Sequence, residues 1–424
     1  MTPMNRWRDA IRMGLGAMCF IALLASAGAT SPRFSPTGPE AALFGADKNY
    51  PVGNRTTWRE TPYLVGSFSR YDTIFPSNRV EPAAQPWNFQ RAKDEPAIRY
   101  DFNGKRYTLD EYLAHFPVTG ILLLQGDTIL LERYQYGRTE TDRFMSASMS
   151  KSIMSLLVGI ALDEKKIQSV EDHVSRYVPE LQGTLYGETS LRALLQMSSG
   201  IDFDGKVNGV KGNAGTQRLI DGITADANPI AVLAACRKRD FPEGTHFDYS
   251  PGDNEATGLA LRRATGMSLS AYLSEKIWKP IGTESVATWW VDTSGQEFPS
   301  SGFNATVRDY ARLGRLLAHD GEWNGRQIVS KSYLIAATTN QAEDRHLAPG
   351  TVTPYYGYGY QFWILPGNKR MFVLRGANSQ YVFVDPASKL VLVQTAVRSE
   401  HPNAENGKSE TLALWLALVK QFGR

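Results

Sequence analysis

The segment Ser148-Met149-Ser150-Lys151 leads directly into the apolar stretch 152–162, which reads Ser-Ile-Met-Ser-Leu-Leu-Val-Gly-Ile-Ala-Leu. Ser148 is the only serine of the chain that is followed by lysine three positions later. Residues three apart share one face of a helix, so Lys151 can reach the Ser148 hydroxyl. Burial in an apolar helix disfavours an ammonium ion, which would leave Lys151 neutral enough to act as a base. The helix N-terminus would also favour an oxyanion that forms on Ser148.

This spacing alone also fits a serine that starts a helix and a lysine that reaches the surface, and a chain of this length contains about one such match by chance. A second element favours the chemical interpretation. Tyr249 lies in the Gly- and Pro-rich loop 242–254, directly before a predicted helix. A phenol beside Lys151 could relay a proton to a leaving group, although such a tyrosine is more often a packed loop aromatic.

A third element is Leu374-Arg375-Gly376-Ala377, which lies on a predicted strand. A strand of small residues beside the nucleophile would let a substrate lie against its backbone. An N–H group of this strand could complete an oxyanion hole. A bulge or a hairpin end is the alternative interpretation.

Strands are predicted near both ends of the chain, at 120–124 with 128–132, and at 371–374, 381–384 and 390–393. Helices are predicted between these regions and at the C-terminus: 191–197, 255–264, 269–277, 307–318, 332–338 and 409–422. This order predicts an α/β fold, in which an antiparallel sheet is flanked by helices and carries a mainly helical insertion at about 165–365. The segment 30–95 has no clear period and is expected to be irregular, so the domain proper would span 96–424.

The order and spacing of Ser148-x-x-Lys151, the Tyr249-Ser250 loop and the Gly376 strand resemble the penicillin-recognising serine hydrolases. The chain is most similar to the class C β-lactamase and esterase branch, especially to 6-aminohexanoate-dimer hydrolase-like members. The resemblance extends from about Phe116 to the C-terminus. It is strengthened by the flanking segments 194–200 (Leu-Leu-Gln-Met-Ser-Ser-Gly), 302–310 (Gly-Phe-Asn-Ala-Thr-Val-Arg-Asp-Tyr) and 357–361 (Gly-Tyr-Gly-Tyr-Gln).

The resemblance implies a role for each matching residue. Ser148 would be the acylated nucleophile, Lys151 its base and Tyr249 the proton relay. The backbone N–H groups of Ser148 and Ala377 would form the oxyanion hole. Asn304, Arg375 and Gly376 would contact the substrate, a small ester or amide, and no cofactor or metal is expected.

Two departures from the family pattern bear on specificity. Where β-lactamases have Tyr-x-Asn, this chain has Tyr249-Ser250-Pro251; where they have Lys-Thr-Gly, it has Leu374-Arg375-Gly376, with Asn378-Ser379-Gln380 as an alternative register. The amide that binds an acylamino side chain and the lysine that helps to hold a carboxylate are therefore missing, although Arg375 could partly replace the latter. These differences favour an esterase or amide hydrolase over a β-lactamase. A non-catalytic or penicillin-binding sensor-type protein on the same scaffold remains the alternative.

The N-terminus has the features of a secretory signal peptide. Three arginines precede the apolar run 13–24, and the small residues 25–29 contain two Ala-x-Ala patterns. We expect residues 1–29 to be removed, which leaves no membrane anchor, and the protein to be periplasmic or extracellular. The alternative, a membrane anchor, would need about 20 apolar residues.

Composition excludes several classes of protein. The 424 residues are 42% hydrophobic and 21% charged, which is typical of a folded domain. The net charge is +3, with 46 basic and 43 acidic residues, so no nucleic-acid partner is expected. No Gly-x-Ser-x-Gly elbow and no metal-binding histidine pairing occurs among the six histidines. The sequence carries no indication of oligomeric state.

Overall fold

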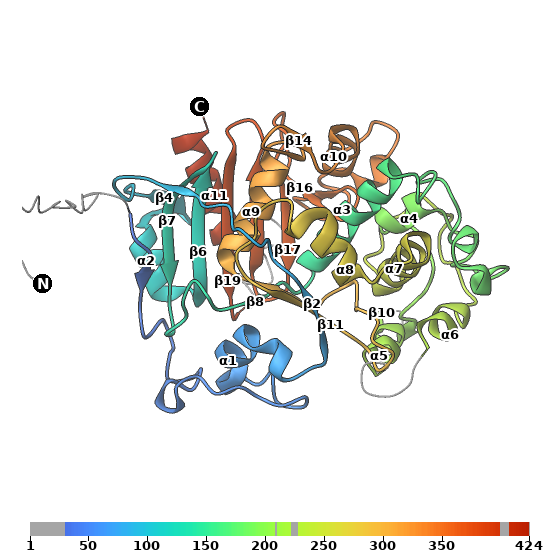
Figure 1. The fold of residues 1–424 in the computed structure, drawn as a ribbon, viewed down its shortest axis with the longest axis horizontal. Helices are drawn as coiled ribbons and strands as arrows, with labels where there is room; N and C mark the ends of the chain where they lie inside the picture. The colour runs from blue at the N-terminus through green and yellow to red at the C-terminus, as the bar shows by residue number, and fades with distance from the viewer. Residues whose placement is uncertain (1–29, 208–209, 222–227, 399–406, 424) are drawn as a thin grey trace, which may run out of the picture.

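A nine-stranded sheet forms the frame of the molecule (Figure 1). The computed structural model describes residues 30–207, 210–221, 228–398 and 407–423. The strand order is β1-β7-β6-β19-β18-β17-β16-β15, and β3 also pairs with β7. The pairs are antiparallel except those of β1 and β3 with β7. The bounds are β1 Arg33–Phe34, β3 Gln90–Arg91, β6 Val118–Gln125, β7 Thr128–Tyr134, β15 Gly357–Tyr358, β16 Trp363–Ile364, β17 Phe372–Gly376, β18 Gln380–Asp385 and β19 Leu390–Ala396.

Two helices cover opposite faces of this sheet: α9 (Val307–Ala318) and α11 (Glu410–Phe422). Alternate residues of β19 point to opposite faces, as the pleat of a strand requires. Val391 packs on the α9 side, whereas Leu392 belongs to the hydrophobic cluster that contains Trp415 of α11. At Gly314 of α9 a Cβ atom would lie only 2.4 Å from the Val391 side chain, so glycine permits this close helix–sheet contact. The predicted antiparallel sheet, built from both ends of the chain and flanked by helices, is confirmed.

The segment between β7 and β17 supplies most of the remaining helices, which gather to the right of the sheet in Figure 1. Helix α3 (Met149–Asp163) lies between the sheet and this group. The other helices are α4 Leu191–Leu195, α5 Ala214–Asp221, α6 Pro229–Ala234, α7 Pro251–Thr265, α8 Leu269–Leu273 with the π-helical turn Ser274–Trp278, and α10 Lys331–Thr338. Helix α9 comes from the same stretch of sequence, yet it packs on the large sheet.

A second sheet of four short strands joins distant parts of the chain in the order β2-β11-β12-β8. Its strands are β2 Ser77–Val80, β8 Phe144–Met145, β11 Ala287–Trp290 and β12 Phe303–Ala305. Three further two-stranded ribbons lie elsewhere: β4 Arg99–Phe102 with β5 Lys105–Thr108, β9 Lys206–Val207 with β10 Val210–Lys211, and β13 Glu322–Trp323 with β14 Arg326–Gln327. The second sheet matters for function because β8 leads directly into α3.

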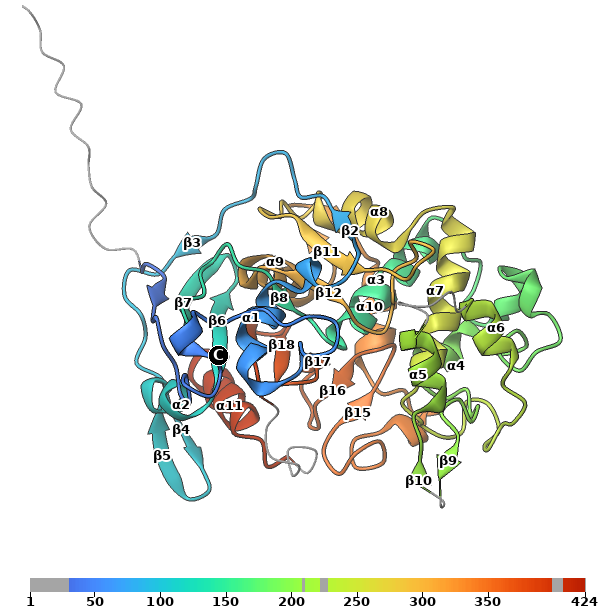
Figure 2. The same cartoon turned by 90° about the horizontal axis from the view of Figure 1, so that it is seen from below.

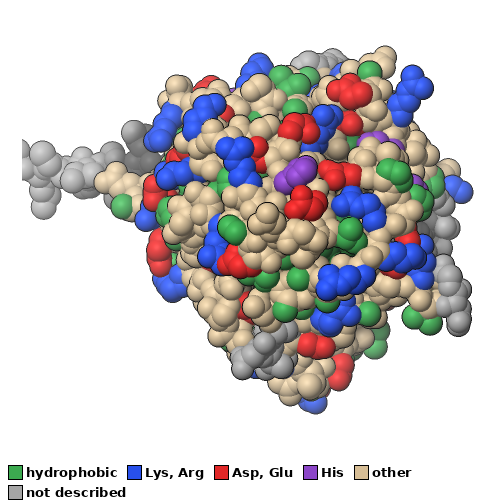
Figure 3. Space-filling view, turned by 90° about the vertical axis from the view of Figure 1, so that its right-hand side faces the viewer, with side chains coloured by type: hydrophobic (Ala, Val, Ile, Leu, Met, Phe, Trp, Pro, Cys, Tyr) green, Lys and Arg blue, Asp and Glu red, His purple; other side chains and the backbone are tan. Residues whose placement is uncertain are grey.

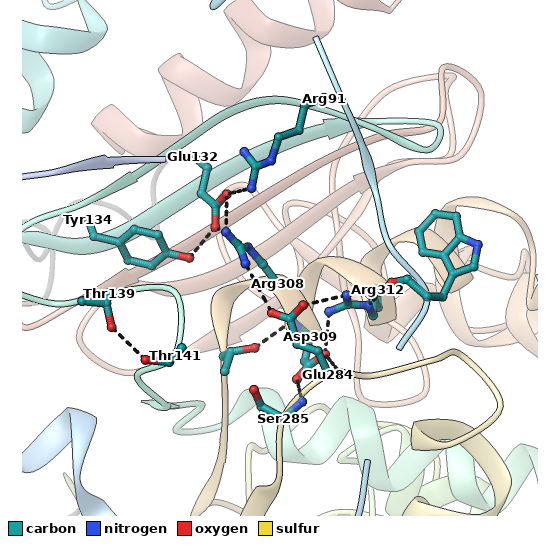
Figure 4. A network of polar contacts seen from close by, with 12 residues as sticks. Arg91, Glu132, Tyr134, Thr139, Thr141, Glu284, Ser285, Arg308, Asp309 and Arg312 are labelled. Atoms are coloured by element: carbon teal, nitrogen blue, oxygen red, sulfur yellow. Dashed lines mark hydrogen bonds and ion pairs between the residues drawn. The ribbon is translucent and has the colours of Figure 1, made fainter. Parts of the chain in front are cut away.

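The segment 30–95 contains only short elements, among them β1, β2, β3 and α1 (Leu64–Ser69), and it wraps along the outside of the domain (Figure 2). A buried ionic network ties it to the core (Figure 4). The fully buried carboxylate of Glu132 on β7 accepts hydrogen bonds from Arg91, from Arg308 at 2.7 and 3.2 Å, and from the Tyr134 hydroxyl at 2.8 Å. Two cations and a phenol therefore compensate one buried charge.

The N-terminal segment 1–29, where the signal peptide is predicted, lies outside the described residues. Among the described helices, none has both the length and the apolar character needed to cross a membrane. On the face shown in Figure 3, blue and red side chains are interspersed, so this face presents no large area of a single charge sign.

Candidate active site

Ser148 lies at the junction between β8 and α3, where it is the N-cap of the helix. The preceding residue, Ala147, has φ of +45°, a left-handed conformation that a non-glycine residue seldom adopts. The backbone N–H of Ser146 donates to the Phe303 carbonyl of β12 at 2.8 Å and fixes this tight turn against the second sheet. Among the described residues, the N–H of Ser148 has no hydrogen-bond partner, as is usual at a helix N-terminus. It is thus available to an incoming anion.

Lys151 is the neighbour of Ser148 that the sequence predicts. Its Nζ lies 3.2 Å from the Ser148 Oγ and donates to the Ser300 carbonyl at 2.8 Å. The residue is only 3% exposed. Burial lowers the pKa of Lys151 from 10.5 to about 7, because the charged amine has lost its water. A large fraction of the amine is therefore neutral near neutral pH, and it can accept a proton from a hydroxyl at this distance.

Tyr249 completes the cluster from the loop before α7. Lys151 Nζ lies over its ring, 4.8 Å from the ring centroid. The tyrosine ring also stacks on Trp363 of β16, with centroids 5.8 Å apart and planes at 29°. Lys211 of β10 donates to the Tyr249 carbonyl at 2.8 Å, and the Ser250 side chain caps α7 by accepting from the Gly252 N–H. The structure therefore brings Ser148, Lys151 and Tyr249 together.

Gly376 at the end of β17 lies directly beside the start of α3. A Cβ atom at this position would lie 2.2 Å from the Ser146 carbonyl oxygen and 3.0 Å from the Ala147 Cβ. Such contacts are impossible for any larger residue without displacement of the backbone, which explains a glycine in this strand. Ala377, the next residue, is exposed. The predicted strand next to the serine is thus present.

Arg375 and Asn304 are placed differently. Neighbouring residues of a strand point to opposite faces, so Arg375 points away from the face that Gly376 turns toward Ser146. Its guanidinium packs over the rings of Tyr356 and Trp363, with distances to their centroids of 4.6 and 4.8 Å. Trp363 also stacks on Tyr249, so Arg375 packs against a residue that borders the cluster.

Asn304 is 1% exposed within the second sheet. Its Nδ2 donates to the Thr288 hydroxyl at 3.3 Å and to the Gly302 carbonyl at 3.0 Å. These two bonds hold the amide nitrogen within the second sheet, while the buried Oδ1 has no hydrogen-bond partner among the described residues. Substrate contact by Asn304 stays a prediction without a contact that supports it.

Sequence reasoning missed two buried residues of the site, Ser300 and Gln361. Ser300 acts through its main-chain carbonyl, which every residue has, so no side-chain pattern could indicate it. Gln361 lies in the segment 357–361, which the sequence indicates only as a flanking match. Among the described residues, no group of three or more histidine, cysteine or acidic side chains is arranged to hold a metal ion.

The chain matches a known protein family over most of its length. The beta-lactamase family model matches residues 107–414, which is most of the chain and includes Ser148, Lys151 and Tyr249. The chain belongs to the beta-lactamase family. The resemblance to the penicillin-recognising serine hydrolases is thereby confirmed, and with it the fold class.

Individual relatives are similar over most of their length. A 6-aminohexanoate-dimer hydrolase of Paenarthrobacter ureafaciens is 28% identical over 352 residues, which cover 80% of this chain and 86% of the relative. A solved Bacillus anthracis protein, assigned as a 6-aminohexanoate-dimer hydrolase, superposes with a TM-score of 0.75 at 25% identity. That alignment covers 87% of this chain and 97% of the other.

The fold also matches a D-stereospecific amidohydrolase of Streptomyces, with a TM-score of 0.52 and 16% identity over 72% of this chain and 94% of that one. The 28%-identical relative is named as a hydrolase, and solved structures of the same fold include a carboxylesterase, an amidohydrolase and penicillin-binding-protein homologues. This chain is accordingly a serine hydrolase of the beta-lactamase fold.

Proposed function

We propose that this beta-lactamase-family chain hydrolyses esters or linear amides through an acyl-enzyme on Ser148. The observation that carries the proposal is the buried Lys151 amine, 3.2 Å from the Ser148 Oγ, with its pKa lowered to about 7. An amine in that state activates a hydroxyl without help from histidine or a metal ion.

In the first half-reaction the Ser148 Oγ attacks the substrate carbonyl and its proton passes to Lys151 Nζ. The Ser148 N–H, with the Ala377 N–H, stabilises the negative charge on the carbonyl oxygen. The tetrahedral intermediate collapses, the bond to the leaving group breaks, and Tyr249 gives that group its proton. Lys151 returns the proton to Tyr249.

In the second half-reaction water attacks the acyl carbonyl and loses its proton to the same Lys151–Tyr249 pair. The Ser148–acyl bond then breaks, the serine oxygen regains a proton, and the acid leaves. All atoms come from the substrate, one water molecule and the three side chains, so no cofactor is needed.

The substrate class follows from the departures from the β-lactamase pattern. Pro251 cannot provide the side-chain amide of the Tyr-x-Asn motif, and Arg375 lies on the face of β17 opposite that of Gly376. A relative that matches 80% of this chain is named a 6-aminohexanoate-dimer hydrolase, so its name refers to a dimer of an amino acid. We therefore expect short esters and linear amides as substrates, and poor turnover of a chromogenic cephalosporin.

Turnover of a p-nitrophenyl ester by the wild type and by Ser148→Ala tests the proposal. We expect Ser148→Ala to lose at least a thousandfold in kcat, in line with the loss of a nucleophile. Equal rates would refute the proposal and favour a non-catalytic or sensor-type protein. Turnover rates on a panel of short-chain esters, linear amides and a chromogenic cephalosporin then rank these substrate classes.

We further propose that the protein is exported, on the basis of the basic and apolar pattern of residues 1–29. N-terminal sequencing of the protein from a bacterial expression host tests this. We expect a mature chain that begins just after Ala27 or Ala29, whereas an intact Met1 in all fractions would contradict export.

A further inference from the structure

Gln361 joins three elements around the catalytic cluster. It follows β15, is 1% exposed and has φ of +66°, a left-handed conformation that is strained for glutamine. Its carbonyl accepts from the Ser152 hydroxyl at 2.5 Å, and Ser152 is the residue after Lys151 on α3. Its main-chain N–H and its side-chain Nε2 donate to carbonyls at the end of α4. Because each of these polar atoms has a partner, the orientation of the side chain is fixed.

The remaining polar atom of Gln361, Oε1, accepts hydrogen bonds from two residues that lie near Tyr249. It accepts from the Asn254 Nδ2 of α7 at 3.0 Å and from the Tyr358 hydroxyl at 3.2 Å. Asn254 lies in the first turn of the helix that Tyr249 precedes, and the ring of Tyr358 packs edge-on against Tyr249. Asn254 also lies 3.4 Å from the hydroxyl of Ser300, whose carbonyl accepts from Lys151. Gln361 therefore hydrogen-bonds both to α3, which carries Lys151, and to α7, which follows the Tyr249 loop.

We infer that Gln361, together with Asn254, is a positioning residue of this hydrolase, which holds α3 and α7 at the spacing that keeps Lys151 against Tyr249 and out of water. The inference rests on the proposed function, because it gives Gln361 a role only through Lys151 and Tyr249. A glutamine that served folding alone would stabilise the protein without setting the state of the Lys151 amine.

A positioning role and a role in folding alone would affect the pH dependence of the hydrolysis rate differently. The titratable groups around this core include Tyr249 from the loop, Tyr358 from β15 and Asp253 from α7. On the outer side of the loop, Lys211 donates to the Tyr249 carbonyl and pairs with Asp248. The carboxyl of Asp253 is held by Ser199 and Tyr186. If α7 moves away from α3, water reaches Lys151 and the pKa of its amine rises toward the ordinary value. The acid limb of the rate profile then moves to higher pH.

The experiment compares Gln361→Met and Asn254→Leu with Tyr333→Phe. Tyr333 makes a buried hydrogen bond to Ser155 on the same helix α3, at 2.9 Å, so its loss is a matched structural change away from the cluster. Hydrolysis of a neutral p-nitrophenyl ester is followed between pH 5 and 9, and thermal melting is recorded for each variant. Lys151→Met is measured in the same series.

We expect Gln361→Met and Asn254→Leu to lower kcat at least tenfold with KM within threefold, and to move the acid limb up by at least half a pH unit. Tyr333→Phe should have a lower melting temperature, but the pH midpoint of its acid limb should match the wild type and its kcat should stay within twofold. The inference is overturned if the first two variants behave like Tyr333→Phe, or if both fail to fold. If Lys151→Met keeps its turnover, the proposed function itself fails, and this result is distinct from the others.

Discussion

The state of the Lys151 amine sets the pH dependence of acylation. With its pKa lowered from 10.5 to about 7, the amine is about half neutral at pH 7. At the ordinary value, 3.5 pH units higher, only about one amine in 3,000 would be neutral, so burial raises the amount of free base on the order of a thousandfold. Because only the neutral amine can take the Ser148 proton, kcat/KM should rise about tenfold per pH unit below 7 and level off above it.

The assay is the pH profile of kcat/KM for a neutral p-nitrophenyl ester between pH 5 and 9. Burial also raises the pKa of the Asp253 carboxyl to about 7, so Asp253→Asn is the necessary control. We expect this variant to keep the midpoint near 7. Lys151→Arg should lose the reaction at every pH in this range, because a guanidinium does not give up its proton.

Three results would refute this reasoning. A midpoint above pH 9 would mean that the amine is solvated, and a flat profile from pH 5 to 9 would mean that no base of this kind limits acylation. If Asp253→Asn lost the rise of kcat/KM with pH below 7, that rise would belong to the Asp253 carboxyl and not to Lys151.

Further changes test other parts of the site and the fold. Tyr249→Phe should slow cleavage of a linear amide about a hundredfold, and that of a p-nitrophenyl ester much less, because only the amine leaving group needs a proton; an equal loss in paired kcat measurements would contradict the relay. Gly376→Ala should lower the free energy of unfolding by about 2 kcal/mol in urea titrations and reduce activity, because its methyl group would meet the Ser146 carbonyl; an unchanged, active variant would show that the strand does not press against the serine turn. Glu132→Gln should cost about 3 kcal/mol in the same titrations, since it removes the buried charge that Arg91 and Arg308 share and leaves Arg308 only its longer ion pair to Glu284 at 3.8 Å; a loss below 0.5 kcal/mol would contradict a network that anchors the N-terminal segment.

The central strands were predictable because their apolar runs are long and uninterrupted. The predicted strands 120–124 and 390–393 lie within β6 and β19. The helix starts at Leu191, Leu269 and Val307 were also predicted to the residue. Helix α7 is different, because it begins at Pro251, four residues before the predicted Glu255. Its first turn is polar and buried around the site, so it lacks the apolar spacing from which a helix is recognised.

The second sheet could not be predicted, because its strands are only two to four residues long and pair across large separations in sequence. The same limit applies within the site. Ser148, Lys151 and Tyr249 carry side chains whose chemistry and spacing indicate them, whereas Ser300 contributes a carbonyl and Gln361 a set of tertiary hydrogen bonds. Such contributions depend on how elements pack, which local sequence does not encode.

Mass spectrometry of the protein after reaction with a fluorophosphonate or a slow ester tests the central claim most directly. The account predicts one adduct per chain, on the peptide that contains Ser148, and its absence from Ser148→Ala. An unmodified wild-type protein, or an adduct at another residue that survives in Ser148→Ala, would contradict the assignment of the nucleophile.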